Sequence, residues 1–149
     1  MRAVVQRVRS CSVSVQGKPD QRIENGLLVY LGVGRGDGEK EARAITDKVL
    51  NLRIFPDTEG KMNLSVKDTG GGLMVISQFT LYGDAREGRR PSYVAAEEPA
   101  KARGVYELAV RLCAESGLPV ATGEFQAHMD ITYTNVGPVT ILLDSEKKF

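Results

Sequence analysis

Apolar and polar side chains alternate with a period of two over residues 3–8 and again over residues 11–16. Such alternation is typical of strands with one buried face, so it predicts two opening strands joined as a hairpin. Turn-forming residues at 17–20 then end the second strand. The next segment, residues 27–33, is continuously apolar. That pattern is typical of a strand buried on both faces and predicts the centre of a sheet.

Two later segments carry apolar residues at the helical period of about 3.6. The first follows Asp37, which we expect to cap the helix, and the second begins near Pro99, a residue favoured in a first helical turn. The predicted buried positions are Ala42, Ile45, Val49 and Leu52 in the first helix, and Val105, Leu108, Ala109, Leu112 and Cys113 in the second.

The remaining segments predict strands. Three glycines at 70–72 open a strand over Leu73 to Leu81, alternation returns over residues 127–134, and a last strand runs from Val139 to Leu143. Strands therefore precede, separate and follow the two helices, with mostly short connections. This order predicts one α/β domain spanning residues 1–149, built on a mixed, mostly antiparallel, barrel-like sheet with two main helices.

Composition narrows the functional classes. The 149 residues carry a formal charge of +1, so the net charge gives no indication of a polyanionic partner. One histidine and two distant cysteines exclude a structural zinc site, and we expect neither metal nor other cofactor. Arginines interrupt the apolar N-terminus, and the longest apolar run is too short to span a bilayer. We expect a cytoplasmic protein with reduced thiols and no membrane partner.

Three candidate catalytic features are weak. The glycine-rich segment 32–38 lies between a strand and a helix, but its spacing fails the GxGxxG and GK[ST] patterns, so we interpret it as a connecting loop. His128 is the sole histidine, and the alternation places it on the polar face of its strand. Cys11 and Cys113 lie in a strand pattern and a helix stripe, where buried thiols are common.

Two short segments depart from ordinary strand chemistry. Ser77-Gln78-Phe79-Thr80-Leu81 places polar side chains at the end of a core strand, where an edge strand is the simpler interpretation. Asn135–Thr140 places Gly137-Pro138 where a strand begins. Such a pair can form a turn, or can hold a cis peptide bond that redirects two carbonyl groups.

Together these segments closely resemble the D-aminoacyl-tRNA deacylases, small homodimeric proofreading enzymes. The resemblance runs nearly end to end, and its most specific parts are SQFTL at 77–81 and GPVT at 137–140. Supporting matches lie at 5–8, 26–29, 60–64, 90–92, 122–123, Phe125 and Met129.

The resemblance implies hydrolysis of the ester that joins a D-amino acid to the 3′-terminal adenosine of tRNA. It implies that Gly137-Pro138 is cis and reaches across a homodimer into the partner's pocket, where its main chain excludes L-amino acids. It also implies the other site residues: Ser77, Gln78, Phe79 and Thr80 lining the pocket, Met129, Phe125 and Ala102 as further walls, and Arg7 bracing the Gly-Pro segment.

The chemistry needs no acid–base side chain. An aminoacyl ester is already activated, so fixed backbone donors at the developing oxyanion and the substrate's own 2′-hydroxyl can suffice. A wall of backbone atoms cannot distinguish side chains, so we expect many D-amino acids, and glycine, to be accepted. Two alternatives remain: Thr80 as a nucleophile, or a non-catalytic nucleic-acid-binding dimer of the same fold. Two arginine clusters are candidate contacts to tRNA phosphates: Arg86, Arg89 and Arg90, and Arg2, Arg7 and Arg9 in the first strand, of which Arg7 has the structural role as its alternative.

Overall fold

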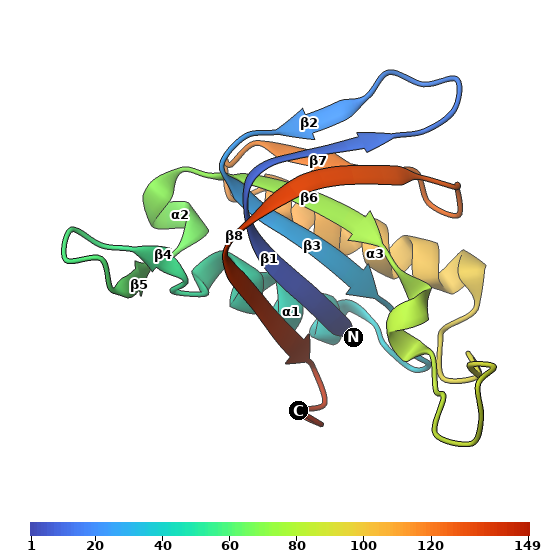
Figure 1. Cartoon of the computed structure of the whole chain (residues 1–149). Helices are drawn as coiled ribbons and strands as arrows, with labels where there is room; N and C mark the ends of the chain where they lie inside the picture. The colour runs from blue at the N-terminus through green and yellow to red at the C-terminus, as the bar shows by residue number, and fades with distance from the viewer.

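The computed structural model describes all of residues 1–149 as one α/β domain (Figure 1). Along the chain its elements are β1 (Arg2–Ser14), β2 (Gln21–Ile23), β3 (Gly26–Gly32), α1 (Glu39–Asn51), β4 (Phe55–Pro56), β5 (Met62–Leu64), α2 (Val66–Thr69), β6 (Gly72–Ser77), the 3-10 helix η1 (Phe79–Tyr82), α3 (Pro99–Ala114), β7 (Val120–Thr122) and β8 (Asp130–Asp144). The predicted fold class is confirmed: two main helices accompany one mixed six-stranded sheet, and β4 and β5 form a small second sheet.

The strand predicted at the centre of the sheet is central. β3 pairs antiparallel with β1 on one side and parallel with β6 on the other, and β7 continues the parallel side. β2 and β8 both pair antiparallel with β1, so the sheet curls towards a barrel (Figure 1). α1 and α3 pack against one face, burying a core that includes Val29, Ile45 and Val105. A smaller cluster, with Leu28 and Met74, fills the inside of the curl.

The predicted opening hairpin is wrong, because β1 is a single strand of 13 residues. Its pairing with β8 shifts register between Gln6 and Val8 and again between Val8 and Cys11. The buried positions change phase at the same points, from Val5 to Val8 to Cys11. Bulges therefore keep apolar side chains facing inward without a turn, and the interrupted alternation imitates two strands.

The two predicted C-terminal strands are likewise one, β8, and residues 127–129 precede it. Val8 of β1 pairs with Asn135, and Gln6 pairs with Thr140. Only Arg7 lies between these positions on β1, whereas residues 136–139 lie between them on β8. The Gly-Pro segment is therefore a large bulge opposite Arg7, and the strand resumes its pairing on both sides of it.

The end of one predicted strand and the start of one predicted helix also differ from the structure. β6 stops at Ser77, and the chain turns into η1 instead of continuing as strand to Leu81. α1 begins after Gly38, which occupies the N-cap position that we expected for Asp37. No helix is both long and apolar enough to cross a membrane.

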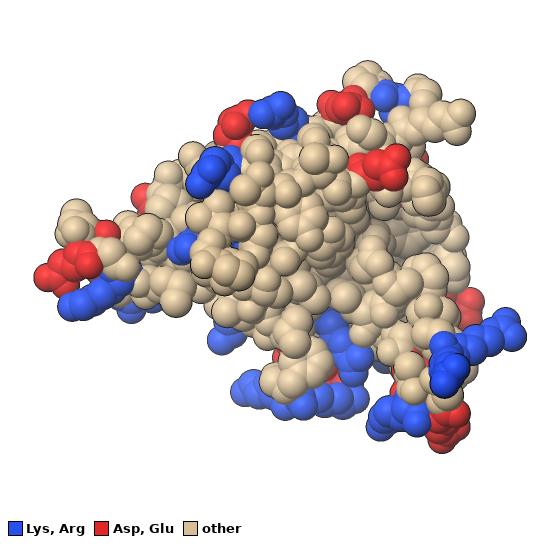
Figure 2. Space-filling model, viewed as in Figure 1, with Lys and Arg blue, Asp and Glu red and all other residues tan.

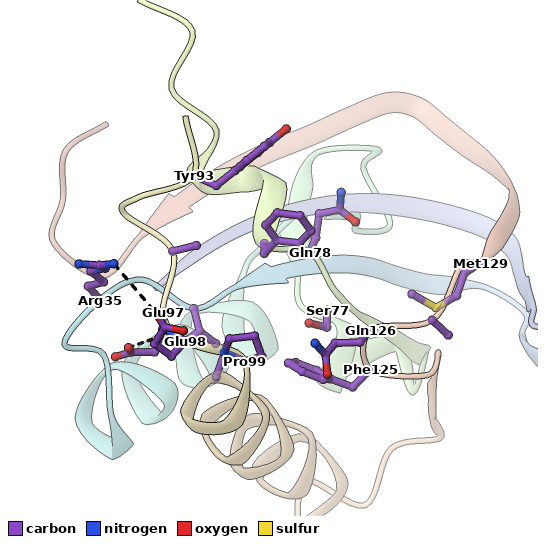
Figure 3. A pocket seen from close by; sticks show the side chains of 15 residues that line it. Arg35, Ser77, Gln78, Tyr93, Glu97, Glu98, Pro99, Phe125, Gln126 and Met129 are labelled. Atoms are coloured by element: carbon purple, nitrogen blue, oxygen red, sulfur yellow. Dashed lines mark hydrogen bonds and ion pairs between the residues drawn. The ribbon is translucent and has the colours of Figure 1, made fainter. Parts of the chain in front are cut away.

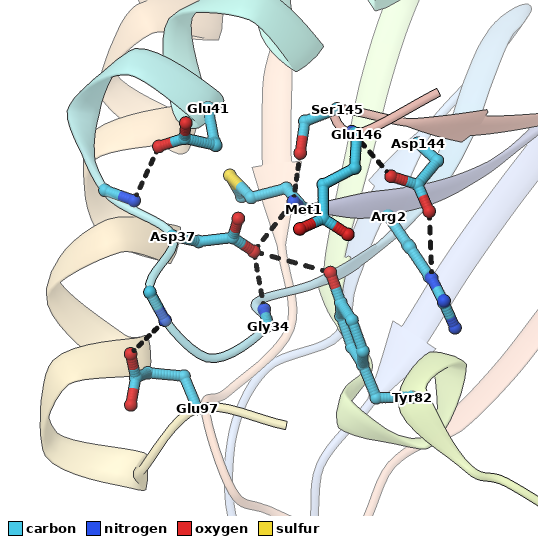
Figure 4. A network of polar contacts seen from close by, with 12 residues as sticks. Met1, Arg2, Gly34, Asp37, Glu41, Tyr82, Glu97, Asp144, Ser145 and Glu146 are labelled. Carbon is cyan, nitrogen blue, oxygen red and sulfur yellow. Dashed lines mark hydrogen bonds and ion pairs between the residues drawn. The ribbon is translucent and has the colours of Figure 1, made fainter. Parts of the chain in front are cut away.

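Asp37 is buried and organises the loop between β3 and α1 (Figure 4). Its Oδ2 lies 2.7 Å from the α-amino nitrogen of Met1 and accepts a hydrogen bond of 2.6 Å from the amide of Gly34. The hydroxyl of Tyr82 donates to the same oxygen at 3.4 Å, and Ser145 contacts the amino group. The carboxylate of Asp37 thus links the first residue to the loop that follows β3. It does not itself cap α1.

Candidate functional site

The main cavity opens at the carboxyl end of β6, between η1, the start of α3 and the segment after β7 (Figure 3). Its volume is about 540 Å³, enough for a nucleoside-sized ligand. Fifteen residues line it: Val33, Arg35, Ser77, Gln78, Phe79, Tyr93, Ala96, Glu97, Glu98, Pro99, Ala102, Phe125, Gln126, Ala127 and Met129.

The end of β6 places Ser77 and Gln78, the first two polar residues of the SQFTL segment, at the cavity. The amide of Gln78 donates to the carbonyl of Leu31 at 2.9 Å, which extends the parallel pairing with β3 by one position. The chain then turns into η1, where Phe79 and Thr80 are the first two residues. Their N–H groups stand at a helix start, where the helix itself offers no acceptor. They are the site's candidate donors to an oxyanion.

Aromatic rings form two sides of the cavity. The ring of Phe79 is 58% exposed and meets Tyr93 edge to face, with centroids 5.0 Å apart. On the opposite side, Phe125 packs 5.8 Å from Tyr106 and beneath the guanidinium of Arg103, 4.9 Å from the ring centroid. A flat base or an apolar side chain can bind between such walls.

Met129 reaches the cavity because position 123 is a glycine. A β-carbon there would lie 2.2 Å from the sulfur of Met129. Any side chain at Gly123 would therefore expel the thioether from this wall.

Two carboxylates at the start of α3 face the cavity, and both are engaged. Glu97 accepts from Lys101 Nζ at 2.6 Å and from the amides of Gly36 and Glu98 at 3.1 and 3.0 Å. Its partnership with Lys101, then the two amides, lowers the pKa of Glu97 to about 2, so it is ionised throughout the neutral range and is a poor general base. Glu98 lies 3.9 Å from the guanidinium of Arg35 at the cavity mouth (Figure 3).

The structure gathers six of the residues expected at the site into this one cavity: Ser77, Gln78, Phe79, Ala102, Phe125 and Met129. Thr80 lies beside it on η1 and is exposed, and its hydroxyl accepts a hydrogen bond from the side-chain amide of Gln78. No acid–base group is among the hydrogen-bond partners of that hydroxyl.

Gly137, Pro138 and Arg7 lie outside the cavity of their own chain. The Gly137-Pro138 peptide bond is cis, and both residues are exposed on β8. Arg7 contacts the segment directly: its Nε donates to the carbonyl of Val136 at 3.3 Å and its Nη1 to the carbonyl of Ile54 at 2.6 Å. The guanidinium therefore ties the Gly-Pro bulge to the chain before β4.

Sequence reasoning missed several lining residues, among them Val33, Arg35 and Tyr93. Val33 and Arg35 belong to the glycine-rich segment that we interpreted as a plain connecting loop. It follows β3, which runs parallel to β6, and the loops after parallel strands meet at one edge of a sheet. The adjacency of these two strands was the signal that the sequence did not contain.

The other candidate nucleophiles and bases lie elsewhere. His128 is exposed and does not line the cavity, as its polar-face position predicted. Cys11 and Cys113 are buried, and loss of solvation raises the pKa of each thiol to about 11, so both are protonated at neutral pH. No group of three or more His, Cys, Asp or Glu side chains is arranged to hold a metal ion.

The family model and three related sequences that match this chain are all described as tRNA deacylases. The family model described as D-Tyr-tRNA(Tyr) deacylase matches residues 4–144. The D-aminoacyl-tRNA deacylases of Thermosipho africanus and Alkaliphilus metalliredigens are each 54% identical over the full length of both chains, and that of Syntrophobacter fumaroxidans is 55% identical.

Solved structures agree on the fold. One described as c-Myc DNA Unwinding Element Binding Protein superposes with a TM-score of 0.90 at 36% identity, covering 97% of this chain and 98% of the other. A probable eukaryotic D-amino acid tRNA deacylase, at 15% identity, has a TM-score of 0.79 over 95% of this chain and 97% of its own, a likeness of fold alone. The chain therefore belongs to the D-aminoacyl-tRNA deacylase family.

Proposed function

We propose that this cavity hydrolyses the ester between a D-amino acid and the 3′-terminal adenosine of tRNA. The observation that carries the proposal is the gathering of SQFTL residues, two aromatic walls and Met129 around one nucleoside-sized cavity. Family membership gives the substrate class. In the reaction, the oxygen of water bonds to the ester carbonyl carbon, the bond from that carbon to O3′ breaks, and a proton from the water passes to O3′. The products are the free D-amino acid and tRNA with a free 3′-hydroxyl.

Catalysis in this proposal comes from the backbone and from the substrate. The N–H groups of Phe79 and Thr80 receive the negative charge that develops on the carbonyl oxygen, which preorganised donors stabilise without reorganising. The ribose 2′-hydroxyl orients the water and relays its proton. Glu97 is held by Lys101 and two amides, and His128 lies outside the cavity, so neither competes for the role of general base.

Selectivity for the D-enantiomer is assigned to Gly137-Pro138 of a second copy of the chain. The pair is exposed on β8 and does not line its own cavity, so it can act on a cavity only across an interface. In that position its carbonyl groups bind the substrate ammonium while its main chain occupies the volume that an L side chain needs. Glycine has no side chain to exclude, so glycyl-tRNA is also accepted in this proposal.

The proposal is tested by incubating the protein with one tRNA charged with matched D- and L-tyrosine and with glycine. We expect release of D-tyrosine and glycine well above the spontaneous rate, and no acceleration for L-tyrosine. Size-exclusion chromatography with light scattering should show a dimer at the assay concentration. Failure to release D-tyrosine would overturn the enzyme assignment, and a monomer that remains selective would overturn the cross-dimer assignment.

Thr80 separates the two catalytic hypotheses. If the substrate supplies the reacting hydroxyl, Thr80→Ala should retain kcat/KM within about tenfold of wild type, because only the hydrogen bond from Gln78 is lost. A lost nucleophile would cost about 10⁴-fold or more. Thr80→Ser, which keeps a hydroxyl, is the matched control. A collapse in Thr80→Ala with tRNA binding and Thr80→Ser activity both intact would establish the nucleophile instead.

A second candidate function is nucleic-acid binding without catalysis. It is favoured by the 36% identical structure described as a DNA unwinding element binding protein, which has nearly the same fold. The same incubation separates the two, since a binding protein would retain charged tRNA without releasing its amino acid.

A further inference from the structure

A short loop, residues 84–92, projects beside the cavity mouth. Its two ends are joined by a pair of backbone hydrogen bonds of 2.8 Å between Asp84 and Ser92. Tyr93 follows the loop directly, lines the cavity and meets the ring of Phe79 edge to face. The base of the loop is therefore anchored to the cavity wall, at the lower right of Figure 1.

The loop contains arginines in two different situations. Arg86 is paired: its guanidinium donates to both carboxylate oxygens of Asp84, with Nε at 2.9 and 3.1 Å. That pairing holds the pKa of Asp84 at about 2, so the two charges cancel at neutral pH. Arg89 and Arg90 are exposed and have no carboxylate partner in the structure, and one acidic residue of the loop, Glu87, is likewise free. The loop thus has one more positive than negative charge, and blue and red side chains both project at the lower right of Figure 2.

The position of these two arginines relative to the cavity is constrained. Only Pro91 and Ser92 lie between Arg90 and Tyr93. These three residue-to-residue steps span at most about 11 Å. Pro91 further restricts the backbone on both sides of its peptide bond. A guanidinium here can reach beyond the cavity mouth without entering the cavity. A polynucleotide whose 3′-terminal adenosine lies in the cavity must pass this mouth, with its nearest phosphates outside.

We propose that Arg89 and Arg90 bind the phosphates that precede the 3′-terminal adenosine of tRNA, so that this loop recognises the single-stranded end of the substrate. The inference rests on the proposed function and adds a second, electrostatic subsite to it. Two arginine–phosphate contacts to a single strand contribute about 1.4 to the slope of log affinity against log salt. Over the tenfold range from 0.1 to 1 M salt, this slope corresponds to about a 25-fold decrease in affinity, so removing both contacts should cost about 25-fold in affinity at 0.1 M salt.

The test compares two substrates with the Arg89→Ala/Arg90→Ala variant. D-Tyrosyl-tRNA carries the phosphates, and D-tyrosyl-adenosine carries the same ester without them. At 0.1 M salt we expect kcat/KM to fall about 25-fold on the tRNA and to stay within twofold of wild type on the adenosine ester, and the difference on tRNA should disappear near 1 M salt.

The control variant is Lys48→Ala/Lys67→Ala, which removes the same net charge from exposed lysines of α1 and α2 that form no ion pair. α2 lies at the opposite end of the molecule from the loop (Figure 1), and we expect this variant to behave as wild type on both substrates. An equal loss on both substrates, or no loss on tRNA, would overturn the phosphate subsite. Wild-type protein that hydrolyses neither substrate would overturn the proposed function itself.

Discussion

Alanine at position 137 is expected to lower kcat/KM for D-aminoacyl-tRNA about 100-fold, the cost of moving a positioning group by about 1 Å. Gly137 has a φ of +123°, and an added β-carbon would lie 2.8 Å from Val139 Cγ2, 3.0 Å from the Val139 amide nitrogen and 3.1 Å from Arg7 Nη2. The backbone must shift to relieve these contacts. The carbonyl groups of the Gly137-Pro138 segment then leave the positions proposed for them at the partner's cavity. The preference for D over L substrates therefore falls together with the activity.

Gly17→Ala is the matched control. Gly17 also has a positive φ, +77°, but its β-carbon would meet nothing within 4 Å, and the residue lies outside the main cavity. Both variants pay a backbone cost of about 1–3 kcal/mol in stability, and only Gly137→Ala should lose activity. Initial rates on D- and L-tyrosyl-tRNA, with the dimer verified for each variant, decide the matter. Full activity and full selectivity in Gly137→Ala would contradict the role given to this segment.

The second large effect concerns stability. Asp37→Asn is expected to lower the free energy of unfolding by about 3–5 kcal/mol, because it leaves the buried α-amino group of Met1 without its charged partner. The side chains of the two residues are 0% and 8% exposed, and the same carboxylate also accepts from Gly34 and Tyr82 (Figure 4). Urea denaturation should show a lower midpoint with an unchanged slope.

An exposed ion pair provides the control for this measurement. Arg22 and Glu24 lie 3.0 Å apart with side chains 64% and 73% exposed. Solvent screens such a pair, so Glu24→Gln should change the free energy of unfolding by less than about 1 kcal/mol. Equal effects of the two substitutions would show that Asp37 is not an energetic centre of the fold.

Much of the architecture follows from local pattern. The continuous apolar run at 27–33 predicted the central strand, and the apolar stripes predicted both long helices, with Ala42, Val105 and Cys113 buried as expected. The errors share a cause. Where β1 and β8 carry bulges, alternation is interrupted although the strand continues, and a one-dimensional pattern cannot distinguish a bulge from a turn.

The candidate site, like the fold, could be predicted only in part from the sequence. The chain alone marked SQFTL and Gly137-Pro138 as unusual, because polar residues ending a core strand and a Gly-Pro pair entering one both oppose ordinary strand preferences. It contained no sign that Arg35, Tyr93 and Glu97 lie around the same cavity as Gln78. Arg35 follows β3, Gln78 follows β6, and Tyr93 and Glu97 belong to the connection between η1 and α3. These segments meet because β3 and β6 pair in parallel and end at one edge of a curled sheet. Periodicity is a local property, so the sequence by itself determined the central strand, the two long helices and the unusual SQFTL and Gly137-Pro138 segments. Long-range strand pairing decided which loops surround the cavity and placed Gly137-Pro138 outside it.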